Sequence, residues 1–114
     1  MRSEELYLRD IVEAAEAVTR FIGDQTWDEF KENEVVGSAV LLKLLNIGEA
    51  ARNISNSMRE SYPEVPWSDV VGFRNLLIHH YFVVMWQIVW ETAISDLPAL
   101  KSQVEEILET QFGS

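Results

Sequence analysis

The chain contains no cysteine, and its two histidines are adjacent, at positions 79 and 80. Without cysteine there can be no disulfide framework, no thiolate metal site and no cysteine nucleophile. Basic residues are also few, because nine Lys and Arg stand against 19 Asp and Glu, for a formal net charge of −10. Affinity for nucleic acid comes mainly from Lys and Arg on phosphates, so any RNA contact must be local. The acidic excess suits either solubility or docking to a basic partner protein.

Long apolar runs are absent as well. None approaches the roughly 20 residues needed to span a bilayer, and the start, MRSEELYLRD, is charged from its second residue. We therefore expect a cytoplasmic protein that is neither exported nor embedded in a membrane. With 114 residues, of which 47% are hydrophobic, the chain is expected to form one domain, 1–114. A domain of this size leaves apolar surface for a partner, which favours self-association.

Hydrophobic periodicity predicts an all-α bundle of four or five helices. The first helix is expected over 4–22, where apolar residues recur at helical spacing. Thr26, followed three residues later by Glu29, is a capping-box pattern that predicts a short connecting helix over 27–32. The segment 34–56 is apolar around most of its circumference, which is typical of a central helix covered on several sides.

The second half of the chain is punctuated by prolines. The sequence SYPEVPW predicts a loop at 59–65, followed by a helix over 66–80. The residues YFVVM at 81–85 then favour an extended or irregular conformation. A last helix is expected over 86–108, with a kink or restart near 95–96 because a proline follows there. The four tryptophans are predicted to serve core or dimer packing: Trp27, Trp67, Trp86 and Trp90.

One stretch, RNLLIHHYF at 74–82, gathers an arginine, an amide, both histidines and a tyrosine. Histidine exchanges protons near neutral pH, and the arginine fork fits a phosphate. In RNA cleavage, the imidazole of His79 would take the 2′-hydroxyl proton or protonate the leaving oxygen. The guanidinium of Arg74 would stabilise the extra charge on phosphorus in the transition state. This chemistry requires no metal and no cofactor.

The spacing within this stretch predicts a dimer. Five positions separate Arg74 and His79 by about 140° around an ideal helix, so they do not share one face. Tyr81 nearly eclipses Arg74 if the helix continues, whereas His79 faces the side also taken by Asn75. A site with both an acid and a base is more easily assembled by two chains across a two-fold axis, each contributing one arginine and one histidine.

Less specific interpretations of the same residues stay open at this point. The pattern R-x4-H also occurs by chance in helical proteins, where the histidine is packed or solvent-exposed and the arginine is a surface cation. A metal site at His79 and His80 is disfavoured, since adjacent helical positions point about 100° apart. Glu49 and Arg52, one turn apart, form either an ordinary surface pair or a site in which the carboxylate supports the active arginine.

Three segments carry a family resemblance. They are NIGEAARNI, PEVPWSDVVGFRNLLIHHYF and IVWETAISDLPALKSQVEEIL. In this order they resemble the HepT-like branch of the HEPN superfamily, over nearly the whole chain. The ordered set IGEAA, PW, RNxLIHxYF, VW and DLPxL is far more specific than R-x4-H alone. The resemblance implies a HEPN-type helical bundle that forms a homodimer, with the R-x4-H motif of each subunit lining a shared cleft.

The resemblance also implies an activity. It points to a metal-independent endoribonuclease that acts on RNA as the toxin of a toxin-antitoxin pair, with an MNT-type nucleotidyltransferase as antitoxin. Carried over by position, Arg74 and His79 are the catalytic pair, and Asn75 is the polar residue beside the arginine. Tyr81 is the residue expected to receive AMP from the antitoxin. The added phosphate would block an RNA-binding cleft by repulsion and bulk.

The sequence departs from the family pattern at two places. His80 replaces a common glycine, so it is a spare proton carrier, a phosphate contact or a solvent-facing substitute. The residues VVM at 83–85 lack the usual glycine and acidic residue, and could expose an apolar surface.

The alternative function is a non-catalytic interaction module, in which an acidic surface docks a basic nucleotidyltransferase and Tyr81 accepts the modification. A third is an orphan helical scaffold with packed histidines.

Overall fold

The computed structural model describes residues 3–79 and 85–113, and the side chains of residues 77–79 lie outside this description. Its regular elements are all helical: α1 (Glu4–Ile22), α2 (Trp27–Lys31), α3 (Glu34–Arg52), α4 (Asn56–Ser61), α5 (Trp67–His79), α6 (Trp86–Glu91), the π-helical segment η1 (Thr92–Asp96) and α7 (Leu97–Phe112). No strand occurs in these described ranges, so the predicted all-α class is confirmed.

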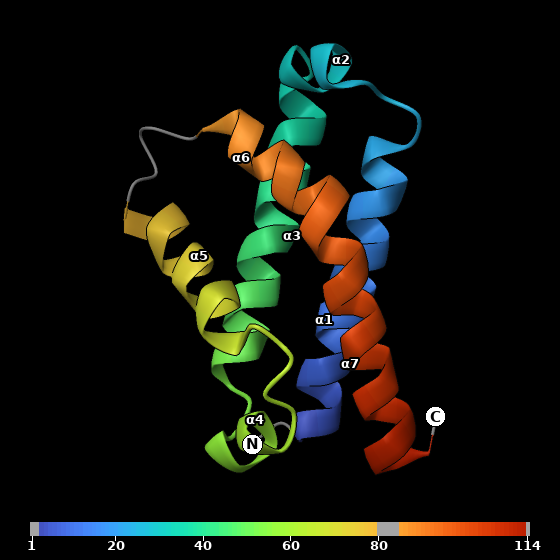
Figure 1. The fold of residues 1–114 in the computed structure, drawn as a ribbon. Coiled ribbons are helices and arrows are strands. Elements are labelled where there is room, and N and C mark those ends of the chain that lie inside the picture. The colour runs from blue at the N-terminus through green and yellow to red at the C-terminus, as the bar shows by residue number, and fades with distance from the viewer. Residues whose placement is uncertain (1–2, 80–84, 114) are drawn as a thin grey trace.

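The longer helices of the described residues, α1, α3, α5 and α7, make up the body of the fold (Figure 1). α3 packs against α1 on one side and against α5 on another, and α1 also packs against α7. The short α2 lies at one end of the bundle and α4 at the other, near both termini of the chain (Figure 1). The helix count exceeds the predicted four or five because the connections themselves contain short helices.

The first two predicted helices are confirmed, and their starts have local causes. The Ser3 side chain accepts a hydrogen bond from the Leu6 backbone N–H and so caps α1. At α2, the Glu29 N–H donates to the Thr26 hydroxyl at 3.3 Å, and the Thr26 N–H donates to the Glu29 carboxylate at 2.9 Å. This is the predicted capping box, which satisfies two otherwise unpaired backbone donors.

The central helix is shorter than the predicted 34–56, because α3 ends at Arg52 and a separate α4 follows. The Arg59 guanidinium donates to the backbone carbonyls of Ala51 at 2.8 Å and Ile54 at 3.2 Å. These bonds tie the Arg59 side chain of α4 to backbone carbonyls at and just beyond the end of α3. The Ser55 side chain then caps α4 by accepting from the Met58 N–H at 3.1 Å.

The predicted loop at 59–65 is partly wrong, since its first three residues belong to α4. The predicted helix over 66–80 is confirmed from Trp67 to His79. Its last predicted residue, His80, lies outside the described residues, as do residues 81–84 of the predicted extended segment.

The last predicted helix, 86–108, is confirmed as a continuous helical run that extends to Phe112. The kink expected near 95–96 corresponds to the π-helical segment Thr92–Asp96, directly before Leu97 and Pro98. A proline removes an intrahelical hydrogen bond and crowds the preceding turn. A wider turn at this place accommodates both effects.

The core lies where α1, α3 and α7 meet. Its fully buried side chains include Leu8, Ile11, Val40, Val104 and Ile107. Trp67 is buried, and the other three tryptophans are partly buried and pack against this core, as predicted. In the described parts of the chain, no helix combines the length and apolar character needed to cross a bilayer.

Candidate functional site

α5 carries the candidate arginine, and its start is anchored by Trp67. This side chain is buried, and its indole N–H donates to the Tyr62 carbonyl at 3.0 Å. The Val70 N–H bonds to the Pro66 carbonyl at 3.0 Å and closes the first turn. The two prolines thus end one helical region, and the buried tryptophan fixes where the next begins.

Two turns further along α5, Arg74 lies directly against Gly48 of α3. A methyl group built on Gly48 would collide with the Cβ of Arg74 and would stand 3.3 Å from its Cα. The root of the arginine side chain therefore occupies the space that any larger residue would fill. Gly48 sets how closely α5 approaches α3 at this point.

The guanidinium of Arg74 is held from two sides. Its Nη2 lies 2.8 Å from Oε2 of Glu49, the residue that follows Gly48 on α3. Its Nη1 donates to Oδ1 of Asn75 at 2.9 Å. Since a guanidinium carries five N–H donors, it can hold both partners and still offer N–H groups to a phosphate.

Glu49 has a second basic neighbour. The Nη1 atom of Arg52 lies 3.8 Å from the same Oε2 atom, so the predicted pair with Arg52 is confirmed. The expected alternative, a carboxylate beside the candidate arginine, is also observed, at the shorter distance. The three side chains Arg52, Glu49 and Arg74 together carry two positive charges and one negative charge.

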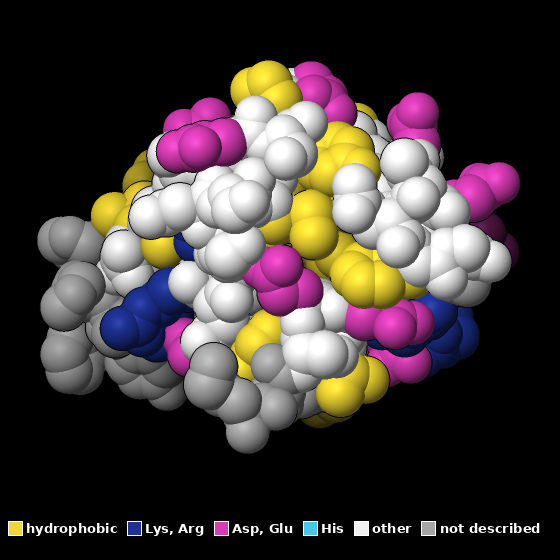
Figure 2. Space-filling model, turned by 90° about the horizontal axis from the view of Figure 1, so that it is seen from below, with side chains coloured by type: hydrophobic (Ala, Val, Ile, Leu, Met, Phe, Trp, Pro, Cys, Tyr) yellow, Lys and Arg dark blue, Asp and Glu magenta, His cyan; other side chains and the backbone are white. Residues whose placement is uncertain are grey.

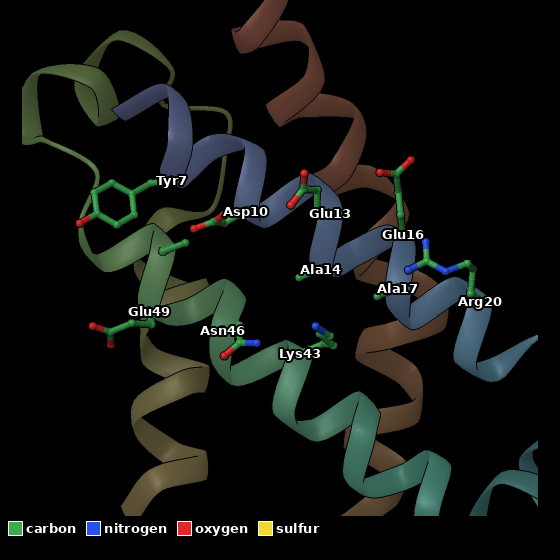
Figure 3. Close-up of a pocket in the computed structure, with 11 residues that line it drawn as sticks. Tyr7, Asp10, Glu13, Ala14, Glu16, Ala17, Arg20, Lys43, Asn46 and Glu49 are labelled. Carbon is green, nitrogen blue, oxygen red and sulfur yellow. The ribbon is translucent and has the colours of Figure 1, made fainter. Parts of the chain in front are cut away.

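The same Glu49 lines a groove between α1 and α3 (Figure 3). Asn46 and Lys43 continue this groove along α3, and Tyr7 and Asp10 contribute from α1. The groove is polar along its rim, with alanines from both helices in its lining. Glu49 therefore stands between this groove and α5.

Only part of the predicted site falls within the described residues. Arg74 and Asn75 are described, and they contact each other. His79 is the last residue of α5, so Arg74 and His79 share one helix as expected, but the His79 side chain lies outside the described part. His80 and Tyr81 lie outside it entirely.

Sequence reasoning missed the role of Gly48. The residue was part of the IGEAA motif, yet its contact with α5 was not predicted. A signal was present, because a glycine inside a strongly apolar helix costs helix stability and usually marks a close packing contact. The sequence does not say which helix makes that contact.

On the face of the molecule seen from below, acidic and basic side chains are interspersed (Figure 2). Figure 2 shows Asp and Glu side chains spread over the lower face, with Lys and Arg toward its left and right sides. Among the described side chains, no group of three or more His, Asp or Glu is arranged to hold a metal ion.

The fold is a helical bundle in which an arginine of α5 packs against a glycine of α3 and pairs with the next residue, a carboxylate. A histidine follows five residues after this arginine. These features agree with one class of proteins, the HepT-like ribonucleases. The family model described as Ribonuclease HepT-like matches residues 11–107, and the chain belongs to this family of HepT-like ribonucleases.

Curated relatives agree with this assignment. A protein of Methanocaldococcus jannaschii named "Putative RNase MJ1380" is 41% identical over 104 residues, which cover 91% of this chain and 95% of the relative. The "Probable ribonuclease HepT" of Thermococcus cleftensis is 37% identical over 106 residues, which cover 93% of this chain and 96% of the relative. No solved structure matches the chain significantly.

Proposed function

We propose that this protein is a metal-independent RNA endonuclease that acts in the cytoplasm as the toxin of a toxin-antitoxin pair. The family supports the ribonuclease class. The observation that carries the proposal is the placement of Arg74, which is only 21% exposed in its side chain and is held at the α3–α5 contact on the helix that ends at His79. A fixed, partly exposed guanidinium is suited to binding a phosphate.

The proposed reaction uses two residue types. An imidazole, from His79, takes the proton from the 2′-hydroxyl, and the 2′-oxygen bonds to phosphorus. The bond from phosphorus to the 5′-oxygen breaks, and the leaving oxygen is protonated by an imidazolium. Arg74 stabilises the charge that builds up on the phosphoryl oxygens in the transition state. The products would carry a 2′,3′-cyclic phosphate and a free 5′-hydroxyl.

An acid and a base in one reaction favour a homodimer. One His79 from each subunit would supply the two proton-transfer groups, and each subunit would add one Arg74. A two-fold axis near α5 would bring both pairs into one cleft. His80 and Asn75 are proposed as supporting residues, and Asn75 already contacts the Arg74 guanidinium.

The proposed antitoxin is an MNT-type nucleotidyltransferase. It would neutralise the enzyme by forming a complex, by transferring AMP to Tyr81, or by both. Tyr81 lies two residues beyond His79 in the sequence, so an added phosphate would stand near the active residues and repel RNA.

RNA cleavage in EDTA tests the proposal. The purified protein should cut single-stranded RNA without added metal, while Arg74→Ala and His79→Ala should each abolish cleavage and retain the dimer. Full cleavage by both variants would contradict the assigned site. Absence of cleavage by the wild type, together with AMP transfer to Tyr81, would instead favour the interaction module.

A further inference from the structure

We infer that Glu49 is a positioning residue for Arg74, which fixes the orientation of its guanidinium toward the substrate phosphate. The inference rests on the proposed function, since it assigns Arg74 to the reaction. Glu49 belongs to α3 and not to the helix that carries the catalytic motif. It would act through Arg74 and would not itself touch the substrate.

The first support is the pair of adjacent residues that α3 presents to α5. Gly48 lets the backbone of α5 come close, which fixes the position of the Arg74 Cα and Cβ. Glu49, the next residue, then contacts the far end of the same side chain, at 2.8 Å from Nη2. Gly48 thus sets where the arginine side chain begins, and Glu49 sets where its guanidinium points.

The second support is that the guanidinium is restrained at both terminal nitrogens. Nη2 faces Glu49, and Nη1 donates to Asn75. Two partners at different nitrogens fix the plane of the guanidinium, and a flexible side chain that is already fixed loses less freedom when it binds a phosphate. Precise placement of a group that stabilises a transition state has large effects on rate.

The third support is the exposure of the pair. The Glu49 side chain is 50% exposed, and ion pairs with such access to water contribute little to folding stability. We therefore assign to this ion pair the orientation of the Arg74 guanidinium and not a contribution to folding stability. A carboxylate near a phosphate also costs some repulsion, which the nearby Arg52 offsets.

Steady-state cleavage of an RNA oligonucleotide separates positioning from a general charge effect. Glu49→Ala should lower kcat by about tenfold to a hundredfold, with a smaller change in KM. Glu49→Gln keeps an acceptor oxygen and should retain more of kcat than the alanine variant. An unchanged or raised kcat in Glu49→Ala would overturn the inference.

One variant serves as a control for charge. Glu16→Ala removes the same charge from the opposite end of the groove that Glu49 lines (Figure 3). It should keep kcat near the wild-type value. A loss in Glu16→Ala equal to that in Glu49→Ala would show that only net charge matters, and would also overturn the inference.

A second readout does not depend on catalysis. Rotation of the Arg74 guanidinium can be followed by side-chain nitrogen NMR, with the signal assigned by its loss in Arg74→Lys. The rotation should be slow in the wild type and faster in Glu49→Ala, and equal rates would contradict the positioning role. If the wild type cleaves no RNA, the proposed function fails while this measurement still decides the inference. If Arg74→Ala is inactive but Glu49→Ala is fully active, the function stands and the inference fails.

Discussion

Gly48 on α3 and Arg74 on α5 lie so close that a single added methyl group on the glycine would overlap the arginine side chain. The contact is the place where α3 meets the helix with the candidate catalytic motif. Packing of the fold and geometry of the site therefore depend on the same pair of residues.

Replacement of Gly48 by alanine should push α5 away from α3. Overpacking of this kind costs about 1–3 kcal/mol of unfolding free energy, and displacement of Arg74 should reduce RNA cleavage strongly. Thermal unfolding by circular dichroism and a cleavage assay measure the two effects.

Gly72 on α5 is the matched control, because no atom of the described residues lies within 4 Å of a methyl group built there. Gly72→Ala should be neutral or should stabilise the protein by up to about 1 kcal/mol, as alanine is the better helix former. Equal behaviour of the two glycine variants would show that the close contact is unimportant.

An aromatic cluster around the buried Phe30 connects α2 with α6. The Phe30 ring centre lies 5.1 Å from that of Trp90 and 6.4 Å from that of Trp86, and Phe30 is almost fully buried. Phe30→Ala should lower the unfolding free energy by about 3–5 kcal/mol, measured by urea denaturation with tryptophan fluorescence. Phe112→Ala, at an exposed position, should change stability far less. A small effect in both would contradict a stabilising role for the cluster.

Tyr81 is expected to gain AMP when the protein is made together with its nucleotidyltransferase partner. Mass spectrometry should show a mass increase of one or more AMP units, and the increase should disappear in Tyr81→Phe. RNA cleavage should fall as the modified fraction rises, because negative phosphate opposes RNA binding. Modification that persists in Tyr81→Phe would place the acceptor elsewhere.

Much of the fold follows from local signals in the sequence. The capping box at Thr26 and the hydrophobic period of residues 4–22 correctly predicted α2 and α1. The break between α3 and α4 was not predicted, because the apolar pattern continues through Ile54. The break is stabilised by Arg59, whose guanidinium reaches back eight residues to the Ala51 carbonyl. Such a side-chain cap depends on the folded chain path, which periodicity does not reveal.

The candidate site was only partly predictable for a related reason. The residue types in RNLLIHHYF indicated phosphoryl chemistry, and the helix that carries Arg74 is confirmed. The pairing of Arg74 with Glu49 was one of two alternatives that the sequence left open, because the two residues are 25 positions apart, on different helices. Helical periodicity shows which residues of one helix share a face, but it does not show which neighbouring helix lies against that face.

Mixing of the wild type with an inactive variant tests the shared site most directly. A mixed dimer of wild type and His79→Ala contains a single His79, so it should lack one of the two proton-transfer groups that the pocket between subunits needs. After subunit exchange in EDTA at constant wild-type concentration, an excess of His79→Ala should therefore lower the rate of RNA cleavage, because wild-type dimers are replaced by inactive mixed dimers. If the mixed dimers form and the rate stays unchanged, each subunit cleaves RNA by itself and the two subunits do not share one pocket.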